Sequence, residues 1–215
     1  MATLAALGRL FLDAVAPRRC AACDRVSQAP ICAACVATLM EAPTPRPLRL
    51  ESGCARAGFV FDGGVREVLH HGKFQGDRPA LRQIAELVAL RLDAAALQPR
   101  PDAVVAVPLG ARRRRQRGYN QAEVLATALA AAAGLPLIAG LTRARETAPQ
   151  ARRDEAARRR NIDGAFAWRG SDVGGASLCL VDDVLTTGAT IDAAAATLRQ
   201  AGAARVDALL VARVP

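Results

Sequence analysis

Lysine and aromatic residues are both scarce in this chain. Lys73 is the single lysine, so the formal net charge of +9 is carried by arginine. A basic surface favours polyanions such as nucleic acid or phosphorylated small molecules, and the guanidinium fork suits bidentate phosphate contacts. A basic surface that is merely solvated is the other interpretation of this charge. Aromatic residues make up only 3% of a chain that is 52% hydrophobic, which indicates small side chains packing helices against a sheet.

Long hydrophobic runs are also absent. No uninterrupted apolar run approaches the roughly 18 residues that a membrane-spanning helix needs. The opening segment, residues 1–16, is apolar, but Arg9 and Asp13 interrupt it and its large apolar residues recur at helical spacing. We expect an amphipathic helix there rather than a signal peptide, and hence a soluble, cytoplasmic protein with no transmembrane segment. The length of 215 residues suits one main domain with a small appendage.

Four cysteines near the start have the spacing of a metal site. Two C-x2-C pairs can supply four thiolates at the corners of a tetrahedron around zinc. Disulfides of a secreted protein and inert buried thiols are the alternatives, and the lack of a secretion signal favours zinc. Cys54 and Cys179 stand apart and are not assigned to metal. The expected zinc ligands are Cys20, Cys23, Cys32 and Cys35.

The order of apolar segments predicts an α/β fold. Pro43, Pro45 and Pro47 form a stiff connector, so we expect residues 1–47 to hold the first helix, a zinc-binding module and this connector, and residues 48–215 to form the main domain. Strands that alternate with helices predict a mostly parallel sheet with flanking helices. The expected strands are Phe59–Phe61, Ala103–Val107, Ser177–Asp182 and Val206–Val211, and the expected helices are Pro79–Leu92, Gln121–Ala133 and Thr190–Gln200.

One loop combines paired acids with small and hydroxyl-bearing residues. Asp182 and Asp183 follow the apolar run Leu178–Val181, and Thr186–Thr190 opens a helix. Adjacent carboxylates can accept hydrogen bonds from vicinal hydroxyls such as those of ribose, and a small-residue turn at a helix N-terminus presents amides to a phosphate. The magnesium-binding strand of an ATPase would require a Walker lysine, which the chain lacks. A simple helix cap at Thr190 is the remaining alternative, but it does not explain the acids.

The segment Leu178–Thr190, LCLVDDVLTTGAT, resembles the signature of type I phosphoribosyltransferases. The ordered combination of motifs along nearly the whole chain resembles the ComF family. Besides that signature and the four cysteines, the combination comprises GKFQGD at Gly72–Asp77, VPLGARRRRQRGYNQAE at Val107–Glu123, Gln150, Arg158, Asn161, and GAF at Gly164–Phe166.

This resemblance implies an N-terminal zinc module, a type I phosphoribosyltransferase-like domain and a part in DNA uptake during natural transformation. Its implied cofactors are structural zinc and magnesium, with phosphoribosyl pyrophosphate as ligand or substrate. Single-stranded DNA and DNA-uptake proteins are the implied partners. By the same resemblance, Asp182 and Asp183 hold the ribose hydroxyls. The 5-phosphate would lie on Thr186, Thr187, Gly188, Ala189 and Thr190, and the pyrophosphate on the loop with Pro108, Leu109 and Gly110.

Two positions depart from the family pattern. Gly110 stands where the family usually has histidine, which leaves pyrophosphate binding to backbone amides and arginines. Arg153 replaces a leucine, so the segment around it is more basic than the family pattern.

The basic residues predict a surface for anions. Arg112–Arg117 crowd the beginning of a predicted helix, where cations oppose the helix dipole, and Tyr119 offers a stacking face beside them. Arg152–Arg160 lie in a segment without large apolar residues, which we expect to close over bound pyrophosphate. Both stretches are expected on one rim that binds single-stranded DNA, with a solvated basic loop as the alternative. Lys73 indicates a place that requires a compact ammonium, unless it is there by chance.

The expected function is phosphoribosyl transfer, a glycosyltransferase reaction on phosphoribosyl pyrophosphate. Magnesium and arginines would stabilise the departing pyrophosphate, and no general base is evident. The alternative is a non-catalytic competence factor that binds single-stranded DNA and uses the fold as a ligand sensor. The expected catalytic residues are Asp182, Asp183, Arg113 and Arg117, and Lys73 is an expected ligand-binding residue.

Overall fold

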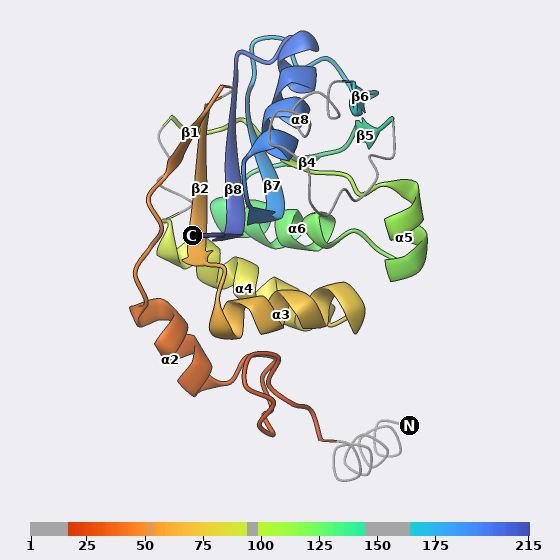
Figure 1. Ribbon diagram of the computed structural model, residues 1–215. Coiled ribbons are helices and arrows are strands. Elements are labelled where there is room, and N and C mark those ends of the chain that lie inside the picture. Colours follow the sequence, from red (N-terminus) through yellow and green to blue (C-terminus); the bar gives the residue numbers. More distant parts are fainter. Residues whose placement is uncertain (1–16, 52, 94–98, 145–163) are drawn as a thin grey trace, which may run out of the picture.

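The computed structural model describes residues 17–51, 53–93, 99–144 and 164–215 (Figure 1). Its main feature is a six-stranded sheet with the strand order β1-β2-β8-β7-β3-β4. The edge strand β1 is antiparallel to β2, and every other neighbouring pair is parallel. The predicted mostly parallel sheet is therefore confirmed. The strands are β1 (Leu48–Leu50), β2 (Gly53–Val60), β3 (Ala103–Ala106), β4 (Leu137–Ile138), β7 (Ser177–Leu185) and β8 (Arg205–Arg213).

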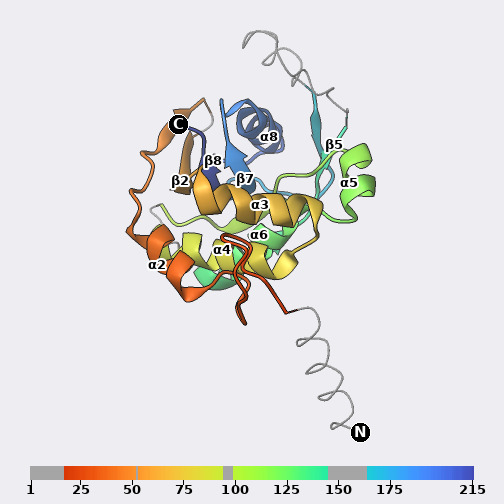
Figure 2. The same cartoon turned by 60° about the horizontal axis from the view of Figure 1, so that its bottom comes forward.

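Helices cover both faces of this sheet. On one face, α8 (Ala189–Gln200) packs over Leu178 and Leu180 of β7. On the other, α4 (Arg78–Arg91) and α6 (Gln121–Ala133) pack over Cys179 and Val181, because successive side chains of a strand point to opposite faces. The helix α3 (Gly63–Phe74) runs beneath the carboxyl ends of the central strands (Figures 1 and 2). A two-stranded antiparallel sheet of β5 (Leu141–Arg143) and β6 (Phe166–Trp168) lies beside α8.

The strand β7 is longer than the sequence predicts. It continues through both aspartates to Leu185, because its ladder with β8 pairs Asp182 with Leu210 and Leu185 with Arg213. The expected end of this strand at Asp182 is therefore too early, and both aspartates lie in the last part of the strand. The strand β2 likewise begins at Gly53 rather than at Phe59.

The arginine-rich segment forms a helix of its own. The helix α5 (Ala111–Arg117) ends at Gly118, whose φ of 74° lies in the left-handed region, and α6 begins only at Gln121. The arginines therefore occupy a short helix of their own, separate from the helix predicted from Gln121. Arg114, Arg115 and Arg117 lie in the last turn of α5, where the helix dipole favours cations rather than opposing them.

The cysteine module packs directly on α4. The Gln83 side chain accepts a hydrogen bond from the Ile31 amide at 2.7 Å and donates one to the Ile31 carbonyl at 3.0 Å. Arg91 donates to the carbonyls of Leu39 and Met40, at 2.6 and 2.9 Å, near the end of α2 (Ala33–Glu41). Cys20, Ile31 and Leu39 belong to the same buried cluster as α3 and α4. The domain boundary at residue 47 stays a prediction.

Within the described residues, no helix is both long and apolar enough to span a membrane.

Candidate functional site

The acidic pair of β7 lies against the end of α3. Lys73 Nζ is 2.7 Å from Asp183 Oδ2, and the two side chains are only 21% and 16% exposed. The Asp183 amide donates to Asp182 Oδ1 at 2.8 Å. The single lysine of the chain thus neutralises one of two adjacent carboxylates at the carboxyl edge of the sheet, where parallel sheets bind their ligands.

The surroundings of Asp182 affect its ionisation. Burial, and then the negative charge of Asp183, raises the pKa of Asp182 to about 7, although the Asp183 amide and Lys73 oppose this shift. Asp182 therefore changes charge near neutral pH. A hydroxyl group can donate to either form, but it donates more strongly to the carboxylate.

The helix α8 begins directly after this strand. Its N-cap is Gly188, with φ of 85°, so the alternative of a cap at Thr190 is not what the structure has. The Ala189 amide donates to the Thr187 hydroxyl at 3.5 Å. Thr186 and Thr187 are exposed beside it. A Cβ atom at Gly188 would lie 2.6 Å from Leu50 Cδ2, so β1 packs against the back of this turn. The amides of the first turn can donate hydrogen bonds to an anion here.

The segment after β3 lies next to the acidic strand. The Val107 amide donates to the Val181 carbonyl at 3.0 Å, which keeps Pro108, Leu109 and Gly110 beside the end of β7. These three residues are partly exposed and lead into α5. With glycine at position 110, this segment offers backbone groups and no imidazole.

A cationic cavity of about 350 Å³ opens beside Lys73. It is lined by Lys73, Phe74, Gly76, Arg113, Gln116 and Arg117. Burial lowers the pKa of Arg117, while the charge of Asp183 opposes that shift. The structure therefore brings Lys73, Arg113 and Arg117 together at one cavity, as expected for residues that share an anionic ligand.

The expected stacking role of Tyr119 is wrong. Its side chain is only 8% exposed, the guanidinium of Arg78 lies 4.5 Å from its ring centroid, and its hydroxyl donates to the Gly72 carbonyl. Among the described residues, the exposed aromatic side chain is that of Phe74 instead, at 66%. Arg117 lies 5.5 Å from the Phe74 ring centroid, and the His70 ring lies at 4.7 Å. In the sequence, the place of Phe74 directly after the single lysine is the feature that could have drawn attention to this aromatic residue.

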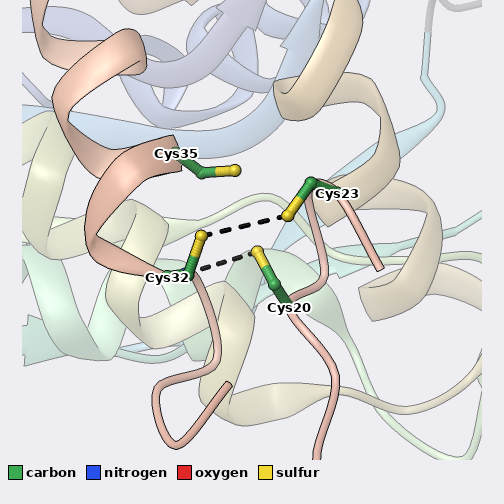
Figure 3. A group of neighbouring side chains, drawn as sticks. All are labelled: Cys20, Cys23, Cys32 and Cys35. Carbon is green, nitrogen blue, oxygen red and sulfur yellow. Dashed lines mark hydrogen bonds between the residues drawn. The ribbon is translucent and has the colours of Figure 1, made fainter. Parts of the chain in front are cut away.

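The four cysteines of the N-terminal module converge (Figure 3). Cys20 and Cys23 belong to a turn that Asp24, with φ of 59°, follows directly. Cys32 precedes α2, and Cys35 lies in the first turn of α2. The four sulfur atoms all lie within 4.8 Å of one another, and Cys23 Sγ is 3.9 Å from Cys32 Sγ. Zinc–sulfur bonds of about 2.3 Å in a tetrahedron require sulfur separations of roughly 3.8 Å. The cluster therefore fits a structural zinc ion.

The thiols of the cluster differ in how readily they ionise. Burial opposes ionisation of Cys20, yet hydrogen bonds from the amides of Cys32 and Ala22 lower the pKa of its thiol to about 6. Burial and the neighbouring thiols raise the pKa of Cys35. The cysteines are free thiols rather than disulfides. Cys179 is outside the cluster, and burial raises its pKa to about 12, as expected for an inert structural thiol.

Several expected site residues lie outside the described residues. They are Gln150, Arg153, Arg158, Asn161 and the stretch Arg152–Arg160, together with the opening segment 1–16.

Proteins with similar sequences carry competence and DNA-utilization names. A stretch of 116 residues, 54% of this chain, is 39% identical to the DNA utilization protein YhgH of Salmonella typhi. Competence protein F of Haemophilus influenzae is 33% identical over 116 residues, and competence protein ComFC of Bacillus subtilis is 29% identical over 155 residues, 69% of this chain. The resemblance to the ComF family is confirmed. No protein-family model matches the chain.

The ComF-like chain matches only part of these relatives. It spans about half the length of the first two, at 51% each, and 59% of ComFC. Among solved structures, the allosteric regulatory enzyme of purine biosynthesis aligns with a TM-score of 0.42 and 22% identity, over 62% of this chain and 25% of that one. Adenine phosphoribosyltransferase of Leishmania tarentolae aligns with a TM-score of 0.40 and 14% identity, over 66% of this chain and 74% of that one. Neither structural similarity carries an argument about ligand or reaction.

Proposed function

We propose that this chain binds phosphoribosyl pyrophosphate with magnesium at the carboxyl edge of its sheet. Asp182 and Asp183 accept hydrogen bonds from the ribose hydroxyls, and Thr186–Thr190 hold the 5-phosphate at the N-terminus of α8. The pyrophosphate lies between Pro108–Gly110 and the cationic cavity of Lys73, Arg113 and Arg117. The ComF resemblance supports the roles of the two aspartates, of Thr186–Thr190 and of the loop after Val107, and the cavity beside Lys73 supports the role of the cations.

The ion pair of Lys73 with Asp183, 2.7 Å long, is the observation that supports the proposal most. It joins the acids, which suit a sugar, to the cations, which suit a diphosphate. A ligand with both groups can therefore contact both halves of the site at once. A ligand that is only an anion would be repelled by the acids, and a neutral sugar would leave the cations unused.

Phosphoribosyl transfer is the reaction that this arrangement suits. Departure of pyrophosphate leaves a ribosyl cation-like centre beside Asp182 and Asp183, whose negative charge stabilises it. Lys73, Arg113 and Arg117 stabilise the charge that develops on the leaving group. Magnesium, when bound, supplies further positive charge to the pyrophosphate. The acceptor provides its own nucleophilic nitrogen.

Calorimetric titration with magnesium and phosphoribosyl pyrophosphate tests the proposal. The double variant Asp182→Asn/Asp183→Asn should bind at least tenfold more weakly than the parent, because two hydroxyl contacts lose their charged acceptors. Glu86→Gln, which removes an exposed carboxylate from α4, is the matched control and should bind as the parent does. Equal binding by the double variant and the parent would overturn the assignment of the acids to ribose.

Turnover separates an enzyme from a sensor. Phosphorus NMR should show release of pyrophosphate when a panel of bases and amines is added. Tight binding without release from any of them would assign the fold to ligand sensing.

A role in DNA uptake is the second part of the proposal. The names of the relatives support it, and so does the surface beside the cavity, where the exposed ring of Phe74 adjoins the arginines of α5. If about six phosphates are neutralised, affinity for single-stranded DNA should fall by roughly 10²–10³-fold between 50 and 200 mM salt. Arg115→Glu should weaken binding more than Arg82→Glu on α4. A flat salt response would contradict this role.

A further inference from the structure

Three consecutive residues between α5 and α6 are buried, and two of them are polar. Tyr119, Asn120 and Gln121 are 8%, 1% and 2% exposed. Asn120 and Gln121 are the buried polar residues of the described part of the chain. Burying an amide costs free energy unless it is hydrogen-bonded, so a buried asparagine requires a structural or functional reason.

Tyr119 reaches from this segment to the end of α3. The last carbonyl groups of a helix have no partner within the helix, and the Tyr119 hydroxyl donates to one of them, the Gly72 carbonyl. Arg78 covers the ring at 4.5 Å, and burial raises the pKa of the hydroxyl, which keeps it protonated as a donor. Gly72 directly precedes Lys73. Tyr119 therefore fixes the turn that carries the lysine.

Asn120 reaches in another direction, to the segment after β3. Its Oδ1 accepts from the Ala122 amide at 3.1 Å and caps α6, while its Nδ2 donates to the Val107 carbonyl at 3.0 Å. The Val107 amide in turn donates to the Val181 carbonyl at 3.0 Å, one residue before Asp182. A cap needs only the acceptor, so the donor to Val107 is an additional function of this side chain.

These contacts form a closed circuit around the candidate site. It runs from Asp183 to Lys73, from Gly72 to Tyr119, from Asn120 to Val107, and from Val107 back to β7. We propose that Tyr119 and Asn120 are positioning residues, which hold Lys73 and the loop Pro108–Gly110 at fixed places next to the acidic pair. The inference rests on the proposed function for its ligand, but the circuit itself exists in the free protein.

Two conservative variants separate positioning from folding. Tyr119→Phe keeps the ring and loses the hydroxyl, whereas Asn120→Asp keeps the capping oxygen and loses the amide donor. Each should weaken binding of magnesium phosphoribosyl pyrophosphate by about five- to tenfold, the effect of one lost hydrogen bond. Thr127→Val is the control, since it deletes a hydroxyl that donates to the Glu123 carbonyl at 2.7 Å on α6. It should bind as the parent does.

A double-mutant cycle tests whether Tyr119 acts through Lys73. In a Lys73→Met background, Tyr119→Phe should weaken ligand binding no further, because the group that it positions is gone. If the losses of binding free energy in the two single variants add in full in the double variant, Tyr119 has a general structural role, and the inference is overturned.

The single lysine gives a readout that needs no ligand. In protein labelled with ¹³C-lysine, the Cε resonance is one signal that reports the environment of the Lys73 ammonium. Tyr119→Phe and Asn120→Asp should shift it toward the value of a free lysine, and Thr127→Val should leave it in place. If the parent protein binds no ligand but the Lys73 signal shifts in the two variants, the proposed function is wrong, and the positioning of Lys73 by Tyr119 and Asn120 is still supported. An unmoved signal in both variants would overturn the inference whether or not ligand binds.

Discussion

Asp182 and Asp183 are neighbours in sequence with different electrostatic partners. Asp183 pairs with Lys73, whereas burial and the charge of Asp183 raise the pKa of Asp182 to about 7. A group whose pKa is higher in the folded than in the unfolded state binds more protons when folded. The folded protein should therefore lose stability as the pH rises from about 4 to about 7. At neutral pH and above, the buried charge of Asp182 therefore destabilises the free protein, and a ligand that donates hydrogen bonds to this carboxylate would reduce the cost.

Asp182→Asn tests this. The amide oxygen can still accept from the Asp183 backbone, but it carries no charge. Parent and variant should be about equally stable at pH 4, and the variant should be more stable at pH 8, by roughly 1–3 kcal/mol. Thermal unfolding at both pH values measures the difference. A stability difference that is the same at pH 4 and pH 8 would show that Asp182 ionises normally.

At the scale of helices and strands, the cysteine module and α4 depend on each other. Ile31 and the end of α2 are held by Gln83 and Arg91 of α4, while the four sulfur atoms lie close enough together to bind one metal ion. Because a structural zinc ion contributes its binding free energy to folding, its loss should release this module from α4.

The metal prediction is one zinc ion per chain. Cys23→Ser should lose the metal and unfold the module, whereas Cys54→Ser, outside the cluster, should retain it. Metal analysis of protein purified without added zinc gives the stoichiometry, and protease cleavage near residue 30 reports the unfolding. A parent protein with only trace metal, or equal metal in both variants, would contradict the zinc assignment.

The elements differ in how well the sequence predicts them. The helix α6 has the predicted bounds because Gly134 ends a long run of good helix formers. The helix α3 is missed, since Gly63, Gly64 and Gly72 disfavour a helix, although Val65, Val68 and Leu69 have helical spacing. The strand β2 is predicted too short because it begins with small residues, which show their alternation only once β8 lies beside them.

For the whole molecule, the candidate site depends on the fold more than on any one motif. The signature in β7 and the four cysteines are evident in the sequence, because each is local. The pairing of Lys73 with Asp183 and the burial of Tyr119 are not, since each joins segments that only the tertiary fold brings together. The parallel topology puts the carboxyl ends of β2, β3 and β7 on one edge of the sheet, where α3 lies (Figure 2). Lys73 belongs to the last turn of α3.

The place of the ligand can be seen in a crystal structure of the protein soaked with magnesium and phosphoribosyl pyrophosphate. The 5-phosphate should lie on the amides at the start of α8, the ribose hydroxyls on Asp182 and Asp183, and the pyrophosphate between Lys73 and the loop Pro108–Gly110. Density for the ligand elsewhere, or none at a concentration that saturates calorimetric binding, would contradict it.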